Sequence, residues 1–210
     1  MKELDLLKKD WKKNSDSFQQ ISETEIYKMI HKKSSSIVKW ILIISILEVS
    51  FWTFSNIFIN TDDLLRKMNH PEILLILDVL TYFNYVVVLI FVIIFYKNYK
   101  TITTTVATKT LMSAILRTRK TVQYYVWYNL GMIVVISILS YFIAYVFNPD
   151  MDFLREKMAL NGKAMFFAIG ILIVIIVGFF GIFWCIYRLL YGRLLRRLYD
   201  NYKELKKIDF

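Results

Sequence analysis

The sequence predicts an all-α integral membrane protein with four transmembrane helices and helical cytoplasmic extensions. Of its 210 residues, 57% are hydrophobic, whereas soluble domains average roughly 45–50%. Four mostly apolar stretches of about 20 or more residues, the length that a helix needs to cross a bilayer, are separated by polar connections. A single cysteine and two histidines exclude a disulfide framework and argue against a zinc site.

The four predicted spans are residues 36–59, 73–96, 126–148 and 165–191. The first follows a hydrophilic stretch, so we expect a membrane span there and not a cleavable signal peptide. No span contains proline. Pro71 and Pro149 fall in the predicted outer loops, residues 60–72 and 149–164, where a proline can end a helix without breaking one.

The distribution of basic residues predicts how the spans are oriented. Lys and Arg number eight in residues 1–35, six in residues 97–125 and seven in residues 186–210. The two outer loops hold only two and three. By the positive-inside rule, both termini and the middle connection therefore lie in the cytoplasm.

Residues 1–35 are predicted to form cytoplasmic amphipathic helices. In the first, Leu4, Leu7 and Trp11 share one apolar face, and lysines cover the remaining surface. The second is predicted to begin near Glu23 and to continue without a break through the first span to residue 59. Its predicted start is a capping box with a hydrophobic staple, formed by Ser22 with Glu25 and by Ile21 with Ile26.

The middle connection, residues 97–125, is predicted to be a basic cytoplasmic linker helix. Leu111, Ile115 and Val122 share one face of this helix. Four basic side chains are predicted to face the anionic lipids of the inner leaflet: Lys109, Arg117, Arg119 and Lys120. A helix packed against its cytoplasmic neighbours explains the same pattern equally well.

The C-terminal segment, residues 192–210, is predicted to be a heptad-like cytoplasmic helix that continues from the fourth span. Its apolar seam has spacings of four and three and comprises Tyr187, Tyr191, Leu194, Leu198, Asn201, Leu205 and Ile208. The seam would pack on the Leu4, Leu7 and Trp11 helix or on a second copy of the chain. The predicted partner-binding residues are Leu4, Leu7 and Trp11 of the first helix and Leu194, Leu198 and Leu205 of the seam.

Two carboxylates lie deep within the predicted spans, where a charge is costly and usually faces the interior of the bundle: Glu48 and Asp78. Counting from the outer ends of the spans places Glu48 at the level of Asn84 and Ser137 and predicts an intramembrane polar layer. Asp78 is predicted about level with Ser55. A hydrogen-bonded seam that holds the bundle together is the favoured interpretation, and a proton or ion path is the alternative.

No catalytic motif is present, because the sequence lacks GxSxG, HExxH, a P-loop and GxGxxG. Neither His31 nor His70 has a nucleophile or a second metal ligand nearby in the sequence. We therefore expect no enzymatic activity, no cofactor and no metal site.

Residues near the N-terminus carry a family resemblance. The chain resembles a group of small multi-span inner-membrane proteins of Bacteroidota at two short motifs. These are Leu4-x-x-Leu7 followed by Trp11-Lys12-Lys13, and the run KKSSSIV at residues 32–38. Several members of that group are encoded beside extracytoplasmic-function sigma factors. The resemblance covers about the first 60 residues. It implies a membrane-tethered, anti-sigma-like regulator whose cytoplasmic helices hold a partner.

Two functional hypotheses follow from these features. The first is a non-enzymatic regulatory or scaffold protein of the inner membrane that binds a cytoplasmic partner through its N-terminal and C-terminal helices. The second is an oligomeric channel or transport component that uses Glu48 and Asp78. The expected partners are anionic lipids, a cytoplasmic protein such as a sigma factor, and a second copy of the chain. Nucleic acid is not expected as a partner.

Overall fold

The computed structural model describes residues 22–58, 71–160 and 162–208, and every regular element within these ranges is helical. The four long helices are α2 (Glu23–Phe58), α4 (Pro71–Thr104), α5 (Thr108–Phe147) and α7 (Gly162–Tyr187). Each belongs to a segment that is long and apolar enough to cross a membrane. The predicted fold class is confirmed. The predicted first helix, with Leu4, Leu7 and Trp11, lies outside the described residues, as does most of the 60–72 connection.

Helix α2 begins at the capping box that the sequence predicts. The backbone N–H of Ser22 donates to Glu25 Oε2 at 3.1 Å, and the backbone N–H of Glu25 donates to Ser22 Oγ at 3.3 Å. This reciprocal pair satisfies two of the backbone donors that a helix start leaves free. The helix then runs for 36 residues without interruption, which is roughly 54 Å. Ile21 of the predicted staple lies outside the described residues.

The middle connection differs from the predicted linker helix, because residues 97–125 do not form a helix of their own. Helix α4 continues to Thr104, residues 105–107 make the turn, and α5 runs for 40 residues from Thr108. The turn follows a threonine-rich run whose hydroxyls donate to carbonyls four residues earlier, as Thr101, Thr103 and Thr104 do. Threonine is a weak helix former. From Thr108 to Leu130 nothing in the sequence interrupts a helix.

The connection that the sequence predicts as an outer loop, residues 149–164, is also largely helical. A 3-10 turn, Pro149–Met151, leads into helix α6 (Asp152–Leu160). The guanidinium of Arg155 ties α6 back to the end of α5. It donates to the carbonyl oxygens of Val146, at 2.7 Å, and Asn148, at 3.2 Å, and it forms an ion pair with Asp152.

Helix α7 continues into the C-terminal helix through one π-helical turn. The turn, η2, spans Arg188–Gly192, and α8 follows at Arg193–Ile208. A π turn accommodates an extra residue and rotates the following helix relative to the preceding one. Gly192 is the last residue of this turn.

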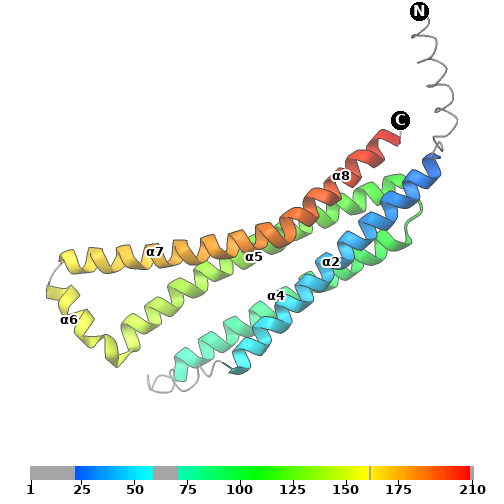
Figure 1. The fold of residues 1–210 in the computed structure, drawn as a ribbon. Helices are drawn as coiled ribbons and strands as arrows, with labels where there is room; N and C mark the ends of the chain where they lie inside the picture. The colour runs from blue at the N-terminus through cyan, green and yellow to red at the C-terminus, as the bar shows by residue number, and fades with distance from the viewer. Residues whose placement is uncertain (1–21, 59–70, 161, 209–210) are drawn as a thin grey trace, which may run out of the picture.

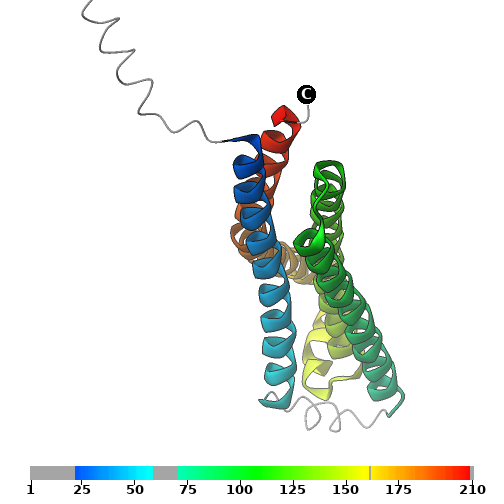
Figure 2. The ribbon, with the colours of Figure 1, turned by 90° about the vertical axis from the view of Figure 1, so that its right-hand side faces the viewer.

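The helices converge at one end of the molecule and separate at the other. At the end where α2 begins and α8 ends, these two helices lie close to the turn that joins α4 and α5 (Figures 1 and 2). We call this the charged end, and it comprises residues 22–38, 97–120 and 193–208. At the opposite end, the α6 end, α5 and α7 diverge and α6 bridges the gap between them (Figure 1).

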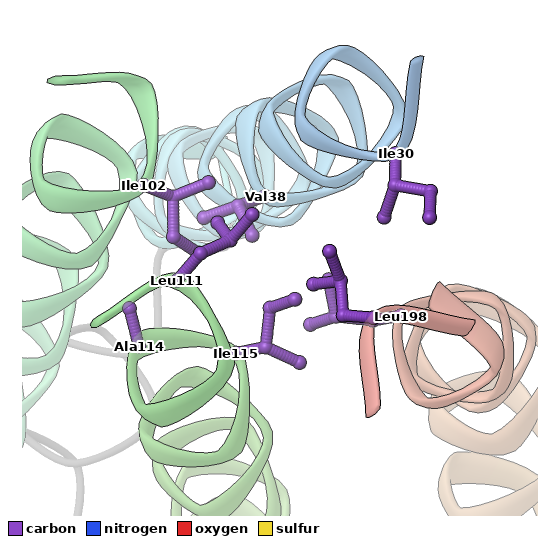
Figure 3. Packing of buried hydrophobic residues seen from close by; sticks show 8 residues of the cluster. Ile30, Val38, Ile102, Leu111, Ala114, Ile115 and Leu198 are labelled. Carbon is purple, nitrogen blue, oxygen red and sulfur yellow. The ribbon is translucent and has the colours of Figure 1, made fainter. Parts of the chain in front are cut away.

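A compact apolar core fills the charged end. It consists of Ile30, Val38, Ile102, Leu111, Ala114, Ile115, Leu198 and Leu205, none of which is more than 5% exposed. Figure 3 shows these side chains pointing toward one another from α2, α4, α5 and α8. The face of residues 108–122 that was predicted to be amphipathic therefore packs on neighbouring helices.

The predicted heptad seam of α8 is covered within the chain itself. Leu198, Asn201 and Leu205 are buried against α2 and α5, and Leu194 is half-buried. The amide Nδ2 of Asn201 donates to Ser34 Oγ on α2 at 3.0 Å. In this arrangement Leu198 and Leu205 have no surface to offer to a partner, because α2 and α5 occupy it. The side chain of Ile208 lies outside the described part of the chain.

Candidate functional site

The most distinctive polar site is built around Glu48, which lies on α2 within the first predicted span. Its carboxylate accepts hydrogen bonds from three tyrosine hydroxyls. Tyr125 Oη lies 2.8 Å from Glu48 Oε2, Tyr191 Oη lies 3.3 Å from the same oxygen, and Tyr187 donates to Oε1. We call these four residues the Glu48 cluster. It joins α2 to α5 and to the junction of α7 with η2.

The local sequence explains why the tyrosines face one carboxylate. Tyr187 and Tyr191 are four residues apart, so they share one face of a helix. Side chains also lean toward the N-terminus of their helix, which for α7 means away from the charged end and toward the middle of the span. Both residues therefore point toward the level at which Glu48 lies.

Aromatic packing holds the three rings in place. The ring of Tyr191 packs edge-on against Tyr125 and is stacked with Tyr187, with centroid distances of 6.0 Å in both pairs. Phe91 and Phe95 of α4 pack edge-on against Tyr125 at 5.4 and 5.5 Å. The three tyrosines are at most 5% exposed. The ring contacts therefore orient the three hydroxyls around the carboxylate.

The electrostatic balance of the Glu48 cluster rests on hydrogen bonds. Among the described residues no Lys, Arg or His forms an ion pair with Glu48. Hydrogen bonds from the three hydroxyls offset part of the cost of placing a carboxylate in apolar surroundings. The arrangement can hold an ionised carboxylate, or it can accept a proton or another cation.

Glu48 also lines a cavity of about 410 Å³ that lies between α2, α4, α5 and α7. The Glu48 cluster is at one end of the cavity, where Tyr125 and Tyr187 share the lining, and Leu77 and Leu139 lie toward the α6 end. Most of the wall is apolar. The polar residues in the lining, apart from the Glu48 cluster, are Thr81, Asn84, Tyr85, Asn129 and Ser137.

The three residues of the predicted polar layer, Glu48, Asn84 and Ser137, all line this cavity. They do not bond to one another. Asn84 Oδ1 accepts from the hydroxyl of Tyr128 at 3.0 Å, and the Ser137 hydroxyl donates to the carbonyl of Ile133 at 2.7 Å. The second predicted carboxylate, Asp78, lies outside the cavity lining, and its side chain is exposed on α4.

The tyrosine partners of Glu48 were not predicted from the sequence. The heptad pattern placed Tyr187 and Tyr191 in the apolar seam, and Tyr125 fell one residue outside the predicted third span. Counting residues from the outer ends of the spans ignores the length and lean of a tyrosine side chain. The signal that could have found the contact is the four-residue spacing of Tyr187 and Tyr191 at the inner end of the fourth span.

The four basic residues of the middle connection take different places at the charged end. Lys109, Arg117 and Lys120 are exposed, whereas Arg119 is half-buried between α5 and α8. The guanidinium of Arg119 stacks on the ring of Tyr199, 4.3 Å from its centroid. Arg119 therefore links two helices, and the other three remain on the surface.

Within the residues that the structure covers, no group of three or more His, Cys, Asp or Glu side chains is arranged to hold a metal ion. The predicted partner-binding residues Leu4, Leu7 and Trp11 lie outside the described ranges. The Glu48 cluster and its cavity are therefore the best-defined candidate site among the residues described.

Comparison with known proteins places the chain in a family. Residues 24–210 match a family described as a domain of unknown function, DUF8845. The chain belongs to this family. Neither the curated proteins nor the solved structures give a match. The range matched to DUF8845 contains the whole Glu48 cluster, the cavity and the core of the charged end, and it excludes Leu4, Leu7 and Trp11.

Proposed function

We propose that the chain is a non-enzymatic regulatory or scaffold protein of the inner membrane that binds a cytoplasmic partner at its charged end. In this proposal both termini lie in the cytoplasm, as the distribution of Lys and Arg predicts. The observation that carries the proposal is the folded bundle at the charged end, where α2, α4, α5 and α8 share one core. Crossing a membrane does not require such a bundle.

The length of the helices supports a bundle that extends beyond the membrane. Helix α2 begins 13 residues before the predicted start of the first span at residue 36, which amounts to roughly 20 Å. Helix α8 adds 16 residues after the π turn, or roughly 24 Å. A surface of this depth is large enough to present a docking face to a soluble protein.

The charge of this surface indicates the chemistry of the partner. Exposed basic side chains come from all four helices of the charged end: Lys28, Lys32, Lys33, Lys97, Lys100, Lys109, Arg117, Lys120, Arg193, Arg196, Arg197, Lys203, Lys206 and Lys207. Basic residues near the membrane attract anionic headgroups, at about 1 kcal/mol each. Those farther out favour a protein with an acidic surface. Nucleic acid is not part of the proposal.

The resemblance of the first 60 residues gives the proposal its most specific form. It implies an anti-sigma-like protein whose partner is a sigma factor encoded beside it. Because α2 and α5 cover Leu198 and Leu205, the apolar contact with a partner falls to Leu4, Leu7 and Trp11, with the half-buried Leu194 at the edge.

The test uses the full chain, tagged and co-expressed with the neighbouring sigma factor. After detergent extraction we expect the sigma factor to co-purify with the wild-type protein. Replacing Leu4, Leu7 and Trp11 together by Ala should abolish this. Phe153→Ala is the matched control, since Phe153 is 73% exposed on α6 at the opposite end. Failure of the sigma factor to co-purify with the wild-type protein would contradict the anti-sigma form.

A second candidate is an oligomeric channel or transport component, and the position of Glu48 in the lining of an intramembrane cavity favours it. Asp78 would act separately, because it is exposed and lies outside that lining. Ion flux into liposomes that is abolished by Glu48→Gln would support this function. The absence of flux at every pH tested would count against it.

A further inference from the structure

The cavity between α2, α4, α5 and α7 has the size of a ligand site and combines one polar end with apolar walls. Its volume of about 410 Å³ falls within the range of roughly 300–1,000 Å³ that is typical of small-molecule pockets. One end carries the Glu48 carboxylate, and the walls toward the α6 end are mainly Leu and Ile side chains of α4 and α5. A ligand that fits would need one polar head and one apolar body.

The polar head of such a ligand would meet a carboxylate that has no basic partner among the described residues. A carboxylate offers about four acceptor sites, and the three tyrosine hydroxyls occupy three of those on Glu48. No described basic side chain is paired with it. Glu48 therefore keeps acceptor capacity and lacks a positive partner from the described part of the chain, so the complementary head is a cation.

Aromatic rings surround the same part of the cavity. Trp52 of α2 and Phe183 of α7 both line it, with their ring centroids 5.9 Å apart, and Tyr125 and Tyr187 complete the aromatic wall. Aromatic faces attract organic cations, and rings gathered around a carboxylate are a recurrent way of binding substituted ammonium groups.

A metal ion fits the cavity less well than an organic cation does. Calcium and magnesium require about six or more oxygen ligands, whereas Glu48 is the only carboxylate among the described residues that line the cavity. The apolar walls would also leave most of a bare ion without ligands. An organic cation loses less hydration and can place its hydrocarbon part against those walls.

We infer that this cavity binds an amphiphilic organic cation, either an amine or a quaternary ammonium compound. Its positive head lies against Glu48 and the aromatic wall. Its apolar part lies along α4 and α5, among residues such as Leu80, Ile133 and Ile136. The inference does not rest on partner binding at the charged end, and the two can fail separately.

The test is a titration of the full chain in nanodiscs of zwitterionic lipid, followed by calorimetry. The probe is benzyldimethyloctylammonium, and octylbenzenesulfonate serves as the probe of opposite charge. We expect saturable binding of the cation with one site per chain, and for the anion no more heat than empty nanodiscs give. No saturable binding of the cation, or equal binding of the anion, would overturn the inference.

Variants locate the site. Glu48→Gln should weaken binding of the cation by about tenfold or more. Asp78→Asn is the matched control, because it removes an intramembrane carboxylate outside the cavity, and its affinity should equal that of the wild type. Ser137→Phe fills the cavity while leaving the Glu48 cluster intact, and it should also weaken binding of the cation. This variant therefore tests the site even where Glu48→Gln fails to fold. Wild-type affinity in folded Glu48→Gln or in folded Ser137→Phe would contradict the assignment.

Discussion

The two ends of the molecule are built from similar helices but are held together differently. At the charged end, eight buried residues from four helices form one core. Among the described residues of the α6 end, the corresponding cluster contains only Ile73 and Ile143 as buried residues. Helix α7, the most apolar of the four, has no buried side chain before Tyr187.

The difference follows from the solvent that each end is expected to meet. In water, burying apolar surface drives helices together. In a bilayer, lipid tails are as apolar as Leu, so packing and hydrogen bonds must provide the association between helices. Buried contacts among the described residues are therefore concentrated in the core of the charged end and in a second cluster in the middle of the bundle, where the three tyrosines of the Glu48 cluster pack with Ile41, Val88, Phe95, Val122 and Leu130. The described part of the α6 end has far fewer of them.

The largest expected effect is the loss of a core side chain at the charged end. Leu198→Ala removes a side chain with no exposed surface, and such changes cost about 2–5 kcal/mol. Leu160→Ala, at a residue that is 81% exposed on α6, should change stability by less than about 0.5 kcal/mol. Thermal unfolding in detergent, followed by circular dichroism, measures both. Equal effects would remove the contrast between the two ends.

The next largest effect concerns the buried hydrogen bond between Asn201 and Ser34. Ser34→Ala leaves the amide of Asn201 without its partner, which costs about 1–3 kcal/mol. Replacing both groups, in Ser34→Ala with Asn201→Leu, removes the unsatisfied amide and should restore most of the lost stability. The same unfolding measurement compares the single and double variants. A double variant no more stable than Ser34→Ala would show that the loss comes from the hydrogen bond itself and not from an unsatisfied amide.

The Glu48 cluster should contribute less per hydrogen bond. Tyr125→Phe removes one hydroxyl from the carboxylate while keeping the ring, and we expect a loss of about 1 kcal/mol, because hydrogen bonds within membranes are worth roughly 0.6–1.7 kcal/mol. Tyr82→Phe is the control, since Tyr82 is 70% exposed on α4. Thermal unfolding in detergent measures the stability of both variants. Equal stability of Tyr125→Phe and Tyr82→Phe would show that the Glu48 cluster does not stabilise the bundle.

The smallest expected effect is at the surface of the charged end. Arg119→Met removes one of two cations that lie over the Tyr199 ring, the other being Lys203 at 4.7 Å, and such contacts contribute about 0.5–1 kcal/mol. Arg117→Met removes an exposed charge on the same helix and should leave the unfolding temperature unchanged. If Arg117→Met destabilises the protein as much as Arg119→Met, the effect is one of net charge and not of the stacking contact.

The features predicted from the sequence are those set by local pattern. Four apolar stretches give four long helices, and the Ser22 and Glu25 pair gives the start of α2. The features that were not predicted depend on tertiary contacts. The partners of Glu48, the cover that α2 and α5 provide for Leu198, and the helical form of residues 149–160 each depend on how separate helices meet. The three- and four-residue spacing of the α8 seam predicts an apolar face but does not identify what covers it.

The central claim is that α8 closes on α2 within a single chain at the charged end. Double electron–electron resonance tests it directly by measuring the distance between two spin labels. The labels are placed at Lys32→Cys on α2 and Lys203→Cys on α8, because both positions are exposed. The native Cys185, itself exposed, is replaced by Ala. We predict a narrow distance distribution that is unchanged when the labelled protein is diluted with excess unlabelled protein. A broad distribution, or one that disappears on dilution, would contradict the account and assign the seam to self-association.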